Sequence, residues 1–140
     1  NNLLPPTVKK KYSKEHVLLL IFIYYFKNIL SIKDIETVLK PLKEKYFSGE
    51  EEVELSDLYE EVCSMEKSRI GTLQEAVKAA YDRATETFTG ITDEESRDEL
   101  QLFAFICNLS FDVYLKKTMI EKIIDGLAEK KSGEETDKTK

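Results

Sequence analysis

Apolar positions recur every three or four residues over most of residues 14–129, a spacing that predicts α-helices. Between residues 17 and 26 almost every position is apolar. The helix over that run should therefore be surrounded by neighbours, with Leu20 and Ile23 among its most buried residues. The run is much shorter than the roughly 20 residues that a membrane span requires, so we interpret it as a core helix of an all-α chain.

Serine residues mark where the first two helices should begin. Ser13 and Ser31 each precede a helical pattern, and a serine hydroxyl in this place accepts a hydrogen bond from a backbone N–H of the first turn. Pro41 fits poorly inside a helix, so a separate short segment should follow the second helix. The predicted elements are a short extended piece at 8–12, helices at 14–29 and 32–40, and a short helical segment at 41–47.

The second half of the chain has helical spacing throughout and divides at Gly90, which is typical of a residue that ends a helix. Thr92, with Glu95 three residues later, is a capping box that should begin the last helical region. Up to residue 88 we expect either one long helix or two helices that break near 68–72. The last helical region should cover 93–129, and a kink near 108–111 is plausible. A disordered polar tail should follow at 131–140.

Charge divides the chain into a basic and an acidic part. Residues 1–45 hold nine lysines against four acidic residues, whereas residues 46–140 hold 12 basic and 23 acidic residues. This asymmetry suggests a basic module that meets a polyanion, joined to an acidic body; an unevenly charged solvated surface is the alternative. We therefore expect an N-terminal region at 1–48, an acidic helical body at 49–130 and the tail.

The inventory for catalysis is small. His16 is the single histidine, and we interpret it as a surface or helix-start residue rather than a catalytic group. Cys63 and Cys107 lie among apolar residues, which is typical of free, buried thiols in a reducing cytosol; a structural disulfide is the alternative. The five glycines form no phosphate-binding loop, and no pattern predicts a metal or a cofactor. We expect a cytoplasmic protein that is not an enzyme.

A basic cluster gives the strongest indication of a partner. Lys9, Lys10 and Lys11 stand next to Tyr12 on the predicted extended piece. Such an edge fits contacts with nucleic-acid phosphates, which add salt dependence rather than sequence specificity. A role of these lysines in solubility alone is the alternative.

Four short motifs carry a resemblance to known families: Leu-Leu-Pro-Pro at 3–6, Lys-Tyr-Ser-x-Glu-His at 11–16, Tyr-Tyr-Phe-Lys at 24–27 and Leu-Ser-Ile-Lys-Asp-Ile at 30–35. In these motifs the chain is similar to the bacterial domain of unknown function 1836 family. Residues 3–44 also resemble the second half of the winged DNA-binding domain of MerR-like transcription regulators. Asn2 and Lys10 depart from the usual pattern, in which Gly and Arg stand at these places.

The MerR-like resemblance implies a truncated winged helix in which residues 8–12 form the wing. It implies that the helices that read bases lie before residue 1, and that the wing residues Lys9 to Tyr12 contact phosphates. The chain by itself should then bind DNA poorly, and the intact protein should bind it in a salt-sensitive way.

The function that follows from this resemblance is a bacterial transcription regulator with a helical body for dimerisation or for sensing an effector, whose chemistry stays open. The alternative is a helical protein-interaction module that has lost DNA binding. A homodimer is expected because one apolar stripe of the last helix should find no partner within the chain; a stripe folded back on residues 73–88 of a monomer is the alternative. The residues of this stripe are Met119, Ile120, Ile123, Ile124 and Leu127.

Overall fold

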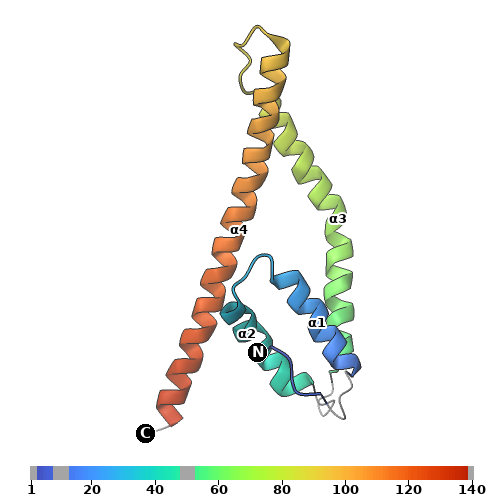
Figure 1. The fold of residues 1–140 in the computed structure, drawn as a ribbon, viewed down its shortest axis with the longest axis vertical. Coiled ribbons are helices and arrows are strands. Elements are labelled where there is room, and N and C mark those ends of the chain that lie inside the picture. Colours follow the sequence, from blue (N-terminus) through green and yellow to red (C-terminus); the bar gives the residue numbers. More distant parts are fainter. Residues whose placement is uncertain (1–2, 8–12, 48–52, 139–140) are drawn as a thin grey trace. The chain divides into compact units, whose positions relative to one another are not determined.

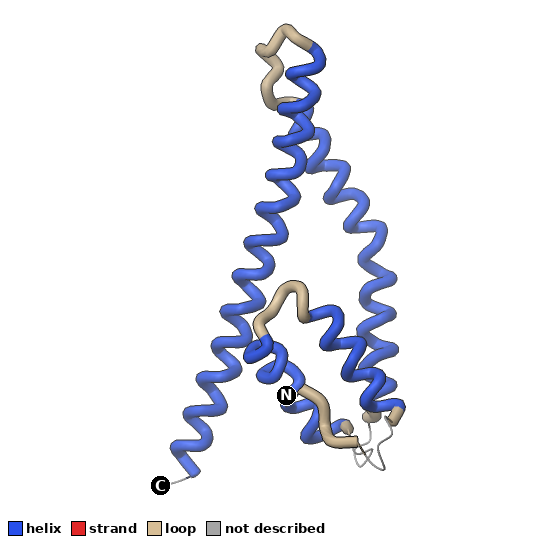
Figure 2. The backbone as a smooth tube through the Cα atoms, viewed as in Figure 1, coloured by secondary structure: helices blue, strands red, loops and turns tan. Residues whose placement is uncertain are grey.

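The computed structural model describes residues 3–7, 13–47 and 53–138, and every regular element in these ranges is helical (Figures 1 and 2). The all-α prediction is therefore confirmed. The predicted extended piece at 8–12 lies outside the described residues. The elements are α1 (Lys14–Phe26), α2 (Ile32–Pro41), the short π-helix η1 (Leu42–Tyr46), α3 (Leu55–Thr85) and α4 (Glu94–Lys138).

The chain forms two compact units. The N-terminal unit comprises Asn1–Cys63 together with Lys117–Lys140, and the hairpin unit comprises Ser64–Lys116. Each of the two long helices, α3 and α4, contributes one part to each unit. The C-terminal part of α4 is thus grouped with the N-terminal helices.

One apolar cluster forms the core of the N-terminal unit. It draws side chains from α1, from α2, from the first turn of α3 and from the C-terminal part of α4. A leucine side chain removed from water in this way contributes about 1.5–3 kcal/mol to folding. The buried members are Leu3, Leu18, Leu19, Phe22, Leu30, Ile35, Leu39, Leu55 and Ile124.

Helix α1 buries one side only. Leu19 is fully buried, whereas Leu20 is 42% exposed and Val17 is also exposed; Ile23 is half-buried. The prediction that this helix is surrounded, with Leu20 and Ile23 among its most buried residues, is therefore wrong for the described structure. A run that is apolar at nearly every position has no periodicity, so the sequence could not indicate which side faces the core.

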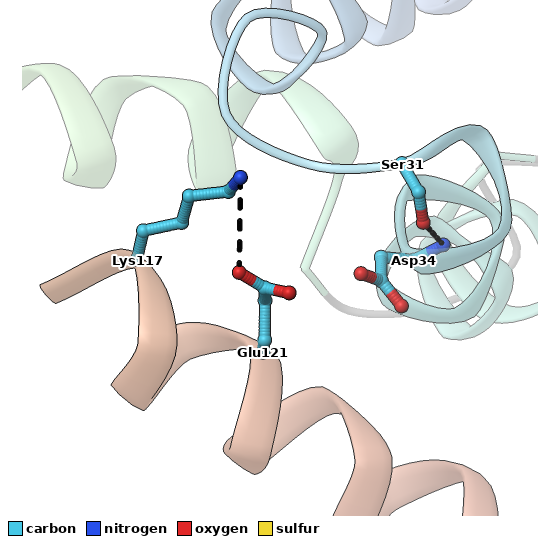
Figure 3. Close-up of polar contacts among 4 residues, drawn as sticks. All are labelled: Ser31, Asp34, Lys117 and Glu121. Carbon is cyan, nitrogen blue, oxygen red and sulfur yellow. Dashed lines mark hydrogen bonds and ion pairs between the residues drawn. The ribbon is translucent and has the colours of Figure 1, made fainter. Parts of the chain in front are cut away.

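The two serine caps are confirmed. The Ser31 hydroxyl accepts a hydrogen bond from the backbone N–H of Asp34 at 3.1 Å (Figure 3), and Ser13 caps α1. Pro41 is the last residue of α2, and the chain continues directly into η1. Because proline has no N–H to donate to the carbonyl four residues earlier, the change of hydrogen-bonding register after it has a local cause.

Neither of the two interruptions considered for the long helices is present in the structure. Helix α3 passes through residues 68–72 without interruption, and α4 passes through 108–111 in the same way. Helix α4 also continues to Lys138, where a disordered tail was expected from residue 131. Helix α3 ends at Thr85, three residues before the predicted end.

The cap of α4 is Asp93 rather than the predicted Thr92. An Asp93 carboxylate oxygen accepts from the backbone N–H of Ser96 at 3.0 Å and also from the Ser96 hydroxyl. These two hydrogen bonds hold the pKa of the Asp93 carboxyl below its ordinary value, and the bond from the Ser96 hydroxyl has the larger effect. Thr92 and Asp93 are both good capping residues, so the pattern alone could not separate two neighbouring candidates.

Candidate functional site

His16 is 2% exposed and forms a reciprocal cap with Ser13 at the start of α1. The backbone N–H of Ser13 donates to Nδ1 of His16 at 3.0 Å, and the backbone N–H of His16 donates to the Ser13 hydroxyl oxygen at 3.3 Å. In the usual capping box a Glu or Gln stands at this third helical position. Here the imidazole performs the same task.

The other ring nitrogen of His16 reaches across the chain. Nε2 lies 3.0 Å from the carbonyl oxygen of Pro5. Because a carbonyl can only accept, this contact assigns the ring proton to Nε2, which leaves Nδ1 as the acceptor for Ser13. The edge of the ring packs against Phe47, with ring centroids 4.9 Å apart.

These contacts join the side chain of His16 to a residue before the basic segment and to a residue after it. Pro5 precedes Lys9–Lys11 and Ser13 follows Tyr12, and both bond to His16. The predicted phosphate-contacting residues Lys9, Lys10, Lys11 and Tyr12 themselves lie outside the described residues. What the structure adds is that the chain on either side of them is fixed to the same imidazole.

The interpretation of His16 as a helix-start residue is confirmed. Of the two alternatives, a surface residue or a helix-start residue, the structure shows the second. The ring is buried and contacts Pro5, Ser13 and Phe47. The Ser-x-x-His spacing was the available signal for the cap. No local signal pointed to Pro5, which lies 11 residues away.

Further lysines are exposed on α1, on α2 and beside them. Among them, Lys27 at the end of α1 lies over the ring of Tyr24, with Nζ 4.7 Å from the centroid. This contact combines a charge with an exposed aromatic face. The exposed lysines described in this region are Lys14, Lys27, Lys33, Lys40 and Lys45.

The predicted dimerisation stripe is divided in the structure. Ile124 is 3% exposed and belongs to the core of the N-terminal unit, whereas Ile123 is 65% exposed. Successive residues of an α-helix differ by about 100°, so these neighbours point to different sides, and Met119 lies one turn from Ile123 on the exposed side. The expectation that the whole stripe lacks a partner within the chain is wrong for Ile124. The exposed members are Met119, Ile120, Ile123 and Leu127.

In the hairpin unit the two helices meet through a small contact. The ring of Tyr81 on α3 packs edge-on against Phe105 on α4 at 5.6 Å. The side-chain amide of Gln101 donates to the carbonyl oxygens of Thr85 and Thr87 at 3.1 and 3.0 Å. Many apolar side chains of α4 stay outside this contact. Those exposed between residues 102 and 115 are Leu102, Phe103, Ile106, Phe111, Val113, Tyr114 and Leu115.

Cys63 and Cys107 are free thiols, as expected, but both are half-buried rather than buried. No group of three or more His, Cys, Asp or Glu side chains that could hold a metal ion is found in the described part of the chain. None of the helices described here is both long and apolar enough to cross a membrane.

The N-terminal unit thus contains a small helical domain in which His16 bonds to Pro5 and to Ser13. In a comparison with known families, residues 1–62 match the family described as Domain of unknown function (DUF1836). The resemblance to this family, read from the four motifs, is confirmed. No curated protein and no solved structure gives a significant match, and the MerR-like resemblance stays a prediction.

Proposed function

We propose that the protein is a DNA-binding transcription regulator that contacts phosphates through Lys9, Lys10 and Lys11. The observation that supports this most directly is that His16 bonds to Pro5 and to Ser13 on either side of the lysines. A segment whose ends are already fixed loses less conformational entropy when it binds a ligand. The lysines would act as point charges on phosphate oxygens rather than as bidentate groups.

The distribution of charge supports the same assignment. The excess of nine lysines over four acids in residues 1–45 attracts a polyanion, while the acidic remainder repels it. The exposed lysines on and beside α1 and α2 lie in the same domain as the basic segment. Together these charges would direct the N-terminal domain towards the nucleic acid.

Titration of a labelled DNA duplex, followed by fluorescence anisotropy at several salt concentrations from about 50 mM upwards, tests the proposal. Replacing Lys9, Lys10 and Lys11 by Ala should flatten the slope of log K against log salt by up to about 0.9 for each phosphate that the variant can no longer neutralise. A matched control removes three lysines near the C-terminal end, Lys130, Lys138 and Lys140. The intact protein is used, since the chain by itself is expected to bind DNA poorly. An equal change of slope in the control, or no binding by the intact protein at about 50 mM salt across a broad set of bacterial promoters, contradicts the proposal.

A second candidate is a non-enzymatic helical interaction module without DNA binding. The observation that favours it is the set of apolar side chains that α4 exposes between residues 102 and 115, because such side chains on a soluble protein often mark an interaction surface. The DNA titration distinguishes the two candidates, because an interaction module should not bind the DNA duplex at any of the salt concentrations.

For either candidate we propose a cytoplasmic location. Two free thiols suit a reducing compartment. Fractionation of cells that produce a tagged protein tests this: recovery with the cytosolic fraction is expected, and recovery in an oxidising compartment with Cys63 joined to Cys107 contradicts it.

A further inference from the structure

Four residues of α4 form an apolar row, here called the α4 stripe: Leu102, Ile106, Leu109 and Val113. Their spacing of four, three and four residues keeps them on one side of the helix. Leu102, Ile106 and Val113 are each more than half exposed, and Leu109 is half-buried. Gln101, which contacts α3, lies on a different side. Phe105 also contacts α3 and lies at one edge of the stripe, three residues from Leu102 and four from Leu109.

Charged residues bracket the α4 stripe in a regular way. Asp98 and Lys116 lie 18 residues apart, which is five full turns, so they share one edge of the stripe. Glu99 and Lys117 have the same separation and share the other edge. All four side chains are exposed. The stripe thus has an acidic pair at its N-terminal end and a basic pair at its C-terminal end, about 27 Å apart along the axis.

We propose that the α4 stripe packs antiparallel against the same stripe of a second copy of this chain, about a two-fold axis level with residues 107 and 108. In that register Leu102 of one copy meets Val113 of the other, and Ile106 meets Leu109. The Asp98–Glu99 pair of each copy lies level with the Lys116–Lys117 pair of the other. One apolar pairing and two clusters of opposite charge arise from a single symmetry operation.

The order of the charges identifies the occupant. A parallel pairing would bring the acidic pair of one copy against the acidic pair of the other, and the basic pair against the basic pair, which is repulsive at both ends. An antiparallel second copy turns both repulsions into attractions without any change in sequence. The 4-3-4 spacing of the stripe is also the spacing of a coiled-coil seam, in which side chains of two helices interlock.

The ion pair that Lys117 forms with Glu121 does not oppose this arrangement. Lys117 Nζ and Glu121 Oε1 lie 3.9 Å from each other, and the two residues are one turn apart on the exposed surface of α4 (Figure 3). Exposed pairs of this kind contribute little, so Lys117 can exchange Glu121 for a carboxylate of the second copy. This pairing does not involve nucleic acid, so its test is independent of the test of the proposed function.

Charge reversal tests the pairing because it predicts complementation. The variant Asp98→Lys/Glu99→Lys and the variant Lys116→Glu/Lys117→Glu should each dimerise at least about tenfold more weakly than the unaltered protein, as measured by sedimentation equilibrium. An equimolar mixture of the two variants should form a heterodimer, since every facing pair is then of opposite charge. A chain with all four substitutions should again form a homodimer.

A matched control reverses two acids on the opposite side of the same helix, Asp125→Lys/Glu129→Lys. Its dimerisation constant should stay within about twofold of the unaltered protein, and circular dichroism should show the same helicity for all variants. The substitution Ile106→Asp should abolish the dimer. The proposal is wrong if the unaltered protein is a monomer at all micromolar concentrations, if the reversed variants dimerise normally, or if Ile123→Asp separates the copies while Ile106→Asp does not.

Discussion

The backbone N–H of Ser13 and the backbone N–H of His16 each donate to the other residue's side chain, at 3.0 and 3.3 Å. This reciprocal cap joins the end of the basic segment to the first turn of α1. Because the same imidazole also bonds to the Pro5 carbonyl, one side chain links three points of the backbone. Its removal should therefore affect more than the helix start.

We expect His16→Ala to lower the free energy of unfolding of the N-terminal unit by about 2–4 kcal/mol, since it removes a cap, a long-range hydrogen bond and a buried ring. Ser13→Ala removes only the hydroxyl and should cost about 1 kcal/mol. Urea denaturation followed by circular dichroism measures both. Equal losses of stability in the two variants would show that the Pro5 and Phe47 contacts add nothing to the cap.

Neighbouring leucines of α1 offer a second, matched comparison. Leu19 is fully buried and Leu20 is 42% exposed, so Leu19→Ala should cost about 2–5 kcal/mol and Leu20→Ala less than about 1 kcal/mol. The same denaturation experiment compares them. A larger destabilisation at Leu20 would mean that α1 turns its other side to the core.

Elements with local causes could be predicted from the sequence, and contacts between distant segments could not. Ser31 was identifiable as a cap because its partner, Asp34, lies three residues away. The choice between Leu19 and Leu20 depends on where α2 lies, and an unbroken apolar run carries no information about that. The contact between His16 and the Pro5 carbonyl is likewise a tertiary contact that the sequence could not predict. The basic composition of the segment between these two residues could be seen in the sequence.

The cap of α4 should respond to pH. The pKa of Asp93 is lowered in the folded chain by its hydrogen bonds to Ser96, so its carboxylate stabilises the helix start at pH values above the pKa of an unfolded aspartate. That contribution disappears as the pH falls through the lower folded pKa. Ser96→Ala removes the hydroxyl donor and should raise the pKa of Asp93, which NMR titration of its carboxyl carbon measures. Thr92→Ala is the control and should leave that pKa unchanged; the reverse pattern would restore Thr92 as the cap.

The position of Ile124 in the core links the end of the chain to its beginning. Ile124 packs in one cluster with residues of α1 and α2, whereas Ile123 is 65% exposed. Ile124→Ala should therefore lower the protection of backbone amides in α1 and α2 against hydrogen exchange, because it leaves a cavity in their shared core. Ile123→Ala changes the same residue type one position away and should leave that protection unaltered. If both substitutions leave the α1 and α2 amides equally protected, the C-terminal part of α4 does not belong to the N-terminal core; if Ile123→Ala alone lowers protection, the helix presents its other side to that core.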